Sequence, residues 1–226
     1  MGEIQVELAT NDAPLTAANF LSYVNESAGS NYDGTFFHRS ILSPNDLEII
    51  QGGGFYLPVN GIAGSVPSKP PVVNEYGISN TRGTIAMAKV GELPDSATNN
   101  WFFNTADNGP NLDTQNGGFT VFGTVTAGMD VVDAIQALNT FNLDAADPGT
   151  FDNVPLFNDA ELVALNSIRV LIVGDVNLDD NVNFSDISPF ISILSAGDFQ
   201  AEADIDQSGV VDFSDIAPFI ALLSGQ

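Results

Sequence analysis

The fold of this chain is decided by the stretch Tyr32-Asp33-Gly34-Thr35-Phe36-Phe37-His38-Arg39, which is followed by Ile50-Gln51-Gly52-Gly53-Gly54-Phe55. The first stretch sets the only histidine beside an arginine, in a chain with 5 Lys and Arg against 29 Asp and Glu and a formal net charge of -24. Each cation is rare in so acidic a protein. We therefore expect Arg39 to be the chemical centre; the alternative is an arginine that pairs with an acidic neighbour.

Length and composition indicate a globular chain with room for two domains. Its 226 residues, 44% of them hydrophobic, can bury a sizeable core. No stretch approaches the roughly 18 to 20 consecutive apolar residues of a membrane-spanning helix. The acidic excess argues against nucleic acid as a partner, because polyphosphate binding depends on clustered cations. Zero cysteines exclude disulfides, thiol catalysis and zinc-thiolate sites.

Short strand patterns punctuated by glycine and proline run through residues 1–173. Alternating apolar residues at Ile4, Val6 and Leu8 predict a strand. Further strands are predicted at 84–88, 119–122 and 162–173, and helices at 14–24 and 129–138. Such closely spaced strands favour a closed antiparallel barrel capped by helices, because closure removes exposed sheet edges.

The composition changes at Gly174, where a sequence repeat begins. The segment 175–191 recurs as 204–220, and residues 174–226 contain no Lys or Arg. Self-similarity of this kind marks two copies of one supersecondary unit that bury their apolar faces against each other. We therefore predict a boundary between a domain at 1–173 and a small domain at 174–226.

Each copy carries the ligand spacing of a twelve-residue calcium loop, with oxygen ligands at positions 1, 3, 5, 9 and 12 and a backbone carbonyl at position 7. The sixth position prefers glycine, which Gly209 satisfies; Asp180 tolerates the left-handed backbone needed there. The alternative is a solvated acidic turn. The predicted metal ligands are Asp175, Asn177, Asp179, Asn181, Asn183 and Asp186 in the first loop, and Asp204, Asp206, Ser208, Val210, Asp212 and Asp215 in the second.

Loop-then-helix repeats with aspartate at the twelfth position resemble dockerin domains, which are small α-helical modules with EF-hand-like calcium loops. The resemblance implies structural Ca²⁺ and a cohesin-like protein partner. In that family the residues just before the twelfth ligand contact the partner, and both copies here read Phe-Ser, at Phe184-Ser185 and Phe213-Ser214. The two phenylalanines could equally pack the core between the repeats. Pro189 and Pro218 require each helix to start late, so that proline lies in the first turn.

The first region resembles cyclophilin-type peptidyl-prolyl isomerases through five blocks in order. Beyond the opening stretches these are Arg82-Gly83-Thr84-Ile85-Ala86-Met87-Ala88, Ser96-Ala97-Thr98 with Trp101-Phe102-Phe103-Asn104, and Gly117-Gly118-Phe119-Thr120-Val121-Phe122-Gly123. The resemblance implies an eight-stranded antiparallel barrel capped by helices, and isomerisation of X-Pro bonds in peptides and unfolded proteins without a cofactor.

Arg39 and Gln51 match that family's catalytic arginine and its supporting glutamine. Strand alternation places Asn100 and Phe102 on the substrate face, and turns Trp101 and Phe103 inward. His38 is turned away from that face and is interpreted as structural. For Leu112, ordinary barrel packing is an equal alternative. The implied substrate-binding residues are Phe37, Ala88, Asn100, Phe102, Leu112 and Phe119.

The region between Arg39 and Gln51 departs from the family. Residues 43–46 look like an inserted loop, and the pocket phenylalanine is replaced by Leu47 or Glu48. The rival hypothesis is therefore a catalytically weak module that binds proline-containing peptides and is tethered through its tail.

The cellular compartment stays open; an export signal upstream of Met1 would place the chain in the periplasm or outside the cell.

Overall fold

A computed structural model of the chain describes all residues except 1, 26–30, 44–45, 60–61, 144–148 and 226. The chain divides into two compact units, residues 1–168 and residues 169–226. The predicted boundary at 173/174 lies five residues inside the second of these. Among the described residues there is no helix long and apolar enough to cross a membrane.

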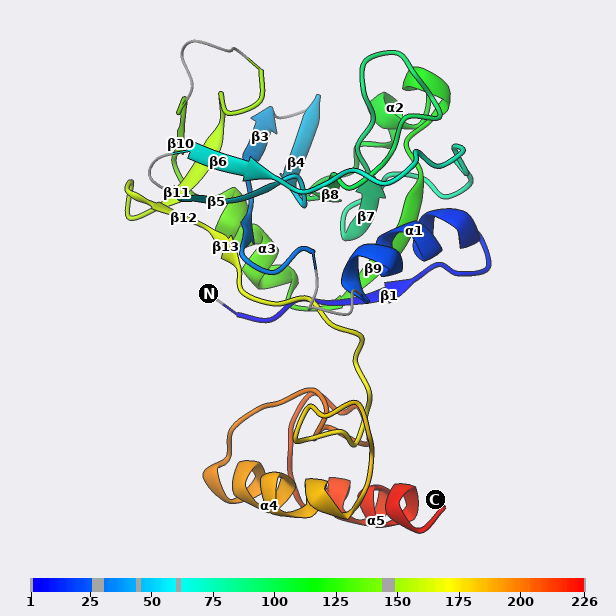
Figure 1. Cartoon of the computed structure of the whole chain (residues 1–226), viewed down its shortest axis with the longest axis vertical. Helices are drawn as coiled ribbons and strands as arrows, with labels where there is room; N and C mark the ends of the chain where they lie inside the picture. The colour runs from blue at the N-terminus through cyan, green and yellow to red at the C-terminus, as the bar shows by residue number, and fades with distance from the viewer. Residues whose placement is uncertain (1, 26–30, 44–45, 60–61, 144–148, 226) are drawn as a thin grey trace. The chain divides into compact units, whose positions relative to one another are not determined.

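The first unit is mainly β, with a few helices (Figure 1). Its helices are α1 (Pro14–Val24), α2 (Gly109–Leu112) and α3 (Met129–Gln136), with a 3-10 turn at Gln115–Gly117. Its strands are β1 (Gln5–Leu8), β2 (Thr35–Phe36), β3 (Arg39–Ser43), β4 (Leu47–Gly52), β5 (Phe55–Val59), β6 (Ile62–Ser65), β7 (Thr84–Met87), β8 (Trp101–Asn104), β9 (Val121–Ala127), β10 (Thr140–Phe141), β11 (Val154–Phe157), β12 (Glu161–Leu162) and β13 (Ala164–Leu165).

The described strands form three antiparallel sheets and not the closed eight-stranded barrel that we predicted. A six-stranded sheet has the order β1-β9-β7-β8-β4-β3, a four-stranded sheet the order β13-β2-β5-β6, and a three-stranded sheet the order β10-β11-β12. The ladder breaks where the chain bends between β2 and β3 and between β4 and β5. Gly53, in the second bend, has a φ of +82°, which a strand cannot continue through.

The predicted helices at 14–24 and 129–138 are confirmed as α1 and α3 within two residues. The predicted last strand at 162–173 is only partly right. β13 does return the chain to a sheet, by pairing with β2, but residues 166–173 form no strand. The hydrophobic pattern could not separate a strand from the connection that follows it.

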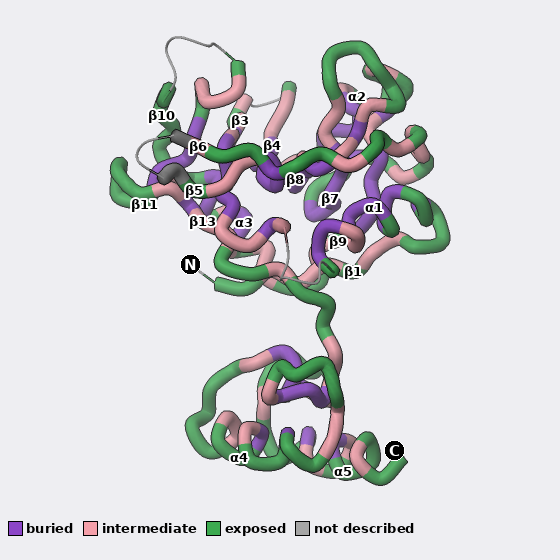
Figure 2. The backbone as a smooth tube through the Cα atoms, in the orientation of Figure 1, coloured by how far each residue is buried: buried purple, intermediate pink, exposed green. Residues whose placement is uncertain are grey.

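The interior of the first unit is an aromatic core on one face of the six-stranded sheet. In Figure 2 the backbone of the central strands β7 and β8 has the colour of buried residues. Phe20 and Tyr23 of α1 pack with Tyr32 and Trp101 through ring contacts of 5.3–6.4 Å. Trp101 is only 1% exposed. Burying aromatic side chains of this size dominates the energetics of a core, so α1 and β8 hold this unit together.

The second unit consists of two similar loop-and-helix units. Each loop ends in a 3-10 turn, Phe184–Asp186 or Phe213–Asp215, and runs directly into a helix, α4 (Ile187–Ala196) or α5 (Ile216–Ser224). Pro189 and Pro218 therefore lie in the first helical turn, as predicted, where a missing amide costs no helical hydrogen bond. The rings of Phe190 and Phe219 stack 4.4 Å apart and are buried between the helices.

A substitution at Gly53 tests whether the packing around Trp101 requires a glycine at this position. A Cβ at Gly53 would lie 2.5 Å from Trp101 Nε1 and 2.6 Å from the Asn99 carbonyl oxygen, in addition to the strained φ. We expect Gly53→Ala to lower the free energy of unfolding by more than about 3 kcal/mol. Gly91→Ala is the matched control, because Gly91 has a φ of +54° but open space around it; it should cost about 1 kcal/mol. Equal costs in chemical denaturation would contradict this account.

Candidate functional site

The antiparallel register sets Arg39, Gln51 and Phe102 in one row across the six-stranded sheet. Arg39 of β3 is paired with Gln51 of β4, and Gln51 is paired with Phe102 of β8. Residues directly opposite each other in an antiparallel sheet project to the same face. The three side chains therefore share one face, although they come from distant parts of the sequence.

A second apolar cluster lies on this face, separate from the aromatic interior. We call it the outer-face cluster. It contains Phe102, whereas Trp101 and Phe103 belong to the interior, as the predicted alternation requires. Its buried members are Ile49, Ala86, Phe102, Leu112 and Val121, and Ile41, Leu47, Ile78, Ala88 and Phe119 pack against them.

Phe102, Leu112 and Phe119, the predicted apolar pocket residues, meet within this cluster. The rings of Phe102 and Phe119 contact each other edge to face, with centroids 5.9 Å apart. The Phe119 amide donates to the Leu112 carbonyl at 3.0 Å. Phe102 and Leu112 are buried and Phe119 is half-buried, so Phe119 is the member of the three with the most exposed ring.

The guanidinium of Arg39 is half-buried and forms no hydrogen bond or ion pair within the described part of the chain. Burial lowers the pKa of Arg39, and the negative charge of Asp152 opposes this shift. The predicted alternative of an acidic ion-pair partner is therefore not observed. The other cations are engaged: Arg82 by Asp133, Arg169 by Glu202, Lys69 by the Ser22 carbonyl, and Lys89 by the carbonyls of Asn116 and Gly118.

Gln51, in the centre of this row, and the residues Ala88 and Asn100 were also predicted to belong to the site. No hydrogen bond joins the Gln51 and Arg39 side chains in the described residues, so the glutamine is beside the arginine without holding it. The Ala88 amide donates to the Asn100 carbonyl at 2.9 Å. The Asn100 side chain lies directly against Gly54, at a position that any Cβ there would occupy. A glycine at 54 is therefore what admits Asn100.

Phe37 does not belong to this face. The structure places it in the interior cluster, 2% exposed, with its ring edge to face with Trp101 at 5.8 Å. Phe37 and His38 belong to neither β2 nor β3, so the alternation of a continuous strand does not carry over from Phe37 to Arg39. Phe37 therefore shares no face with Arg39, although the two are separated by two positions.

His38 is buried on the side away from Arg39, as predicted. Its ring packs against Phe36, Phe55 and Phe151. Burial lowers the pKa of His38 from 6.5 to about 4, the charge of Arg39 acts in the same direction, and a hydrogen bond to the Phe36 backbone opposes it. The imidazole is thus uncharged at neutral pH.

Ile49 and Lys89 are among the residues of the outer-face arrangement that sequence reasoning missed. Ile49 is two positions before Gln51 on the same strand, so alternation alone could have found it. Lys89 follows Ala88, and no sequence pattern predicts that its ammonium lies 4.6 Å from the centroid of the Phe119 ring. Of the two candidates for the replaced pocket residue, Leu47 joins the cluster. Glu48 is not among its members.

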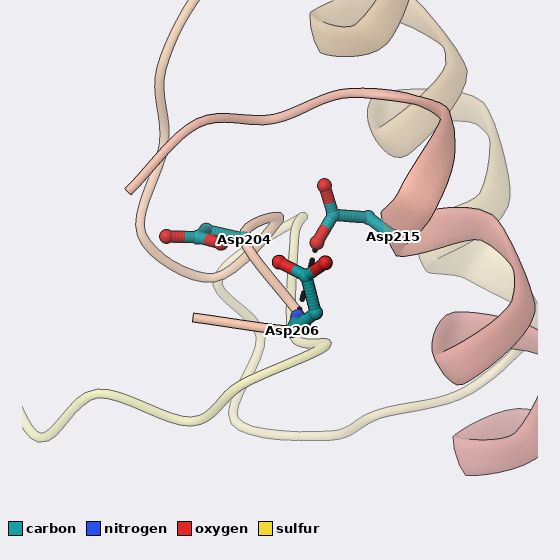
Figure 3. A group of neighbouring side chains, drawn as sticks. All are labelled: Asp204, Asp206 and Asp215. Carbon is teal, nitrogen blue, oxygen red and sulfur yellow. Dashed lines mark hydrogen bonds between the residues drawn. The ribbon is translucent and has the colours of Figure 1, made fainter. Parts of the chain in front are cut away.

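In the second unit, the two loops fold backbone amides onto corresponding carboxylates. Asp204 accepts hydrogen bonds from the amides of Ser208 and Gly209, at 2.9 and 2.8 Å. Asp215 is fully buried and accepts from the amide of Asp206 at 3.0 Å. Single carboxylate oxygens of Asp204, Asp206 and Asp215 all lie within 4.8 Å of one another (Figure 3).

The first loop repeats this pattern. Asp175 accepts from the amides of Asp179 and Asp180, at 3.0 and 2.8 Å. The buried Asp186 accepts from the amide of Asn177 at 2.9 Å. Asp180 has a φ of 64° where Gly209 has 87°, so aspartate does adopt the left-handed backbone at the sixth position. At the predicted ligand positions the first loop has three carboxylates and the second has four, because Asn177 and Asn183 correspond to Asp206 and Asp212 while Asp179 corresponds to Ser208.

The remaining predicted ligands lie along the same loops. Hydrogen bonds from Ser214 and Ser208 lower the pKa of Asp206, and hydrogen bonds from Ser214 also lower that of Asp212. Asp212 and Asn183 each cap the following 3-10 turn as part of a capping box. Oxygen donors gathered this closely are the kind of set that a hard cation such as Ca²⁺ binds.

Phe184 and Phe213 are on the surface. They are 76% and 80% exposed, whereas Phe190 and Phe219 are each 3% exposed and form the contact between the helices. The alternative left open by the sequence, that Phe184 and Phe213 pack the core, is therefore wrong.

Comparison with known proteins gives a consistent result for the first unit. Residues 1–156 match the family described as cyclophilin type peptidyl-prolyl cis-trans isomerase/CLD. A peptidyl-prolyl cis-trans isomerase of Acinetobacter baylyi is 44% identical over 156 residues, which are 69% of this chain and 75% of the relative. Peptidyl-prolyl cis-trans isomerase B of Escherichia coli is 41% identical over 147 residues, 62% of this chain and 81% of the relative.

Among solved structures, a cyclophilin type peptidyl-prolyl cis-trans isomerase of Cryptosporidium parvum, crystallised in the presence of the dipeptide ala-pro, has a similar fold. The TM-score is 0.53 at 19% sequence identity, and the match covers 76% of this chain and 94% of the other. At this identity the likeness concerns the fold alone.

Proposed function

The chain belongs to the family of cyclophilin-type peptidyl-prolyl cis-trans isomerases, and on that premise we propose that Arg39 drives the rotation of X-Pro bonds in peptides and unfolded proteins. The observation that carries this assignment is the guanidinium of Arg39, which has no hydrogen bond or ion pair with any described residue and lies on the same sheet face as Gln51 and the outer-face cluster. Such a cation is available to a substrate.

The chemistry follows from amide resonance. Rotation about an X-Pro bond faces a barrier of about 18–20 kcal/mol because the nitrogen lone pair is delocalised into the carbonyl. As the bond twists, the lone pair localises on the prolyl nitrogen. The Arg39 guanidinium can then donate a hydrogen bond to that nitrogen and stabilise the twisted state over the planar ones. Partial burial strengthens this interaction by excluding water.

The neighbouring residues would hold the substrate. We assign the proline ring to the apolar wall of Phe102, Leu112 and Phe119, with Ile49 beside them. Gln51, the Ala88 backbone and Asn100 are assigned to the peptide around the proline. This step needs no proton transfer and no cofactor, which suits a site where the adjacent histidine is buried and uncharged.

Arg39→Ala tests the catalytic assignment. We expect kcat/KM for a proline-containing tetrapeptide in a protease-coupled assay to fall by about 100-fold or more, since a donor used mainly in the transition state is lost. Arg82→Ala is the matched control, because its guanidinium is engaged by Asp133 at 2.6 Å, and it should keep wild-type activity. An Arg39→Ala variant as active as the parent would instead favour the proline-binding module without Arg39 catalysis.

We also propose that the two loops of the second unit bind Ca²⁺ and that the ion has a structural role. The supporting observation is the repeated gathering of oxygen donors, with three carboxylates within 4.8 Å in the second loop. Like charges this close repel one another, and a divalent cation removes the repulsion. The predicted loop ligands are retained in this proposal, with Asn181 and Val210 contributing their carbonyls.

Calcium binding is expected to raise the melting temperature of the second unit, and chelator should reverse the effect. Asp206→Ala should weaken the affinity of the second loop by about tenfold or more in calorimetric titration, since ligand charge tunes calcium affinity. Asp198→Ala removes an exposed carboxylate of the same unit outside both loops, and it should bind calcium normally. No heat of binding and an unchanged melt would leave only two acidic turns.

We further propose that the second unit is a dockerin-like docking module for a cohesin-like partner, which Phe184 and Phe213 contact. Their exposure, at matching positions of the two repeats, supports this assignment. Exposed aromatic residues of this size commonly anchor protein interfaces.

Changing both Phe184 and Phe213 to Ser should therefore abolish binding to purified cohesin domains in biolayer interferometry, without altering calcium binding. The control variant Phe199→Ser changes an exposed phenylalanine outside both calcium loops, and it should leave binding intact. Cohesin domains that bind the parent and the Phe184/Phe213 double variant equally would rule out this surface.

A further inference from the structure

Lys89 follows β7 in the sequence, and its side chain contacts the loop that precedes Phe119. Its half-buried ammonium donates to the carbonyls of Asn116 and Gly118, at 2.8 and 2.6 Å. The same ammonium lies over the face of the Phe119 ring, 4.6 Å from the centroid. Burial lowers the pKa of Lys89, and the charge of Asp95 opposes this shift. The ammonium is thus partly shielded from water, and a cation–π contact is stronger when the cation is desolvated.

The loop held by Lys89 has an unfavourable backbone conformation. Asn116, Gly117 and Gly118 have consecutive φ values of 50°, 75° and 79°. A left-handed conformation costs free energy at a residue with a side chain, such as Asn116. The two carbonyls that accept from Lys89 flank Gly117, so the ammonium offsets this cost by closing the loop.

Phe119 follows this loop directly, and its surroundings fix it on several sides. Its amide donates to Leu112, and its carbonyl accepts from Asn80 Nδ2 at 3.0 Å. Its ring contacts that of Phe102 edge to face, and the ammonium of Lys89 lies over its face. The half-exposed ring of Phe119 is therefore the part of the apolar wall whose position depends on a charged side chain.

We propose that Lys89 is a positioning residue that fixes the Phe119 ring, and with it the wall that receives the proline of the substrate. The inference rests on the proposed function, in which Phe119 contacts the proline ring. Lys89 touches no reacting atom in this account and acts through Phe119. Its loss should therefore weaken substrate binding more than it slows bond rotation.

Lys69 provides a matched control within the same unit. Its ammonium donates to the Ser22 carbonyl at 2.6 Å and lies 4.8 Å from the centroid of the Tyr23 ring. The chemistry is the same as at Lys89, but Tyr23 belongs to the aromatic interior and not to the outer-face cluster. Removing Lys69 costs the same kind of contacts without disturbing the proposed wall.

The test measures KM and kcat of the full-length chain for a proline tetrapeptide, in the parent and in Lys89→Met, Lys89→Arg, Lys69→Met and Arg39→Ala. We expect Lys89→Met to raise KM about tenfold with kcat within about threefold, and Arg39→Ala to lower kcat. Lys89→Arg should restore KM to within about threefold, because a guanidinium can bond both carbonyls and stack on the ring. Lys69→Met should match the parent.

The outcomes separate the two proposals. If Arg39→Ala is inactive while Lys89→Met keeps the parental KM, the role of Lys89 is refuted and the proposed function stands. A rise in KM that is equal in Lys69→Met and Lys89→Met, or one that Lys89→Arg does not reverse, also overturns the positioning role. If Arg39→Ala has parental activity, the proposed role of Arg39 is refuted, whatever the result for Lys89. Far-ultraviolet circular dichroism confirms folding, and Lys89→Gln replaces any Lys89→Met protein that does not fold.

Discussion

Strand β8 is buried on both faces, and the rest of the first unit depends on this constraint. Trp101 and Phe103 enter the aromatic interior, while Phe102 between them enters the outer-face cluster. The side-chain period of a strand is two, so a slip of one residue would exchange the two sets and bury the wrong surfaces. The register with β4 is thereby fixed, and it sets Gln51 opposite Phe102 and Arg39 opposite Gln51.

Arg39 differs from the other cations of this acidic chain in its electrostatic surroundings. In a chain of formal net charge -24, the other cations are held by carboxylates or carbonyls, whereas Arg39 is influenced by the charge of Asp152. Within the described residues its guanidinium is partly desolvated without a hydrogen-bonded partner, which raises the free energy of the unliganded site. In the mechanism that we propose, the prolyl nitrogen accepts a hydrogen bond from Arg39 when the amide bond twists, and this recovers that free energy.

In the second unit the electrostatic problem is the repulsion between carboxylates, and both repeated loops compensate for it in the same way. Its carboxylates are close together, and backbone amides of both loops turn inward to meet them at equivalent positions. Hydrogen bonds from these amides compensate part of the hydration that buried Asp186 and Asp215 lose. The stacked pair Phe190 and Phe219 supplies the apolar contact between the repeats, and leaves Phe184 and Phe213 free on the surface.

Sequence alone determined the alternation along β8, the helices α1 and α3 and the repeat in the tail, and it singled out Arg39 as a candidate, because each depends on local periodicity or on a motif of adjacent residues. Only the tertiary structure decided that the described strands form separate sheets, that Phe37 is interior, that Leu47 and not Glu48 joins the outer-face cluster, and that Lys89 reaches Phe119. These depend on where bends such as the one at Gly53 interrupt a strand, and on which distant segments are then brought into register. A bend interrupts the alternation by which odd and even positions of a strand face opposite sides of the sheet. Packing between residues far apart in sequence leaves no local pattern from which it could be inferred.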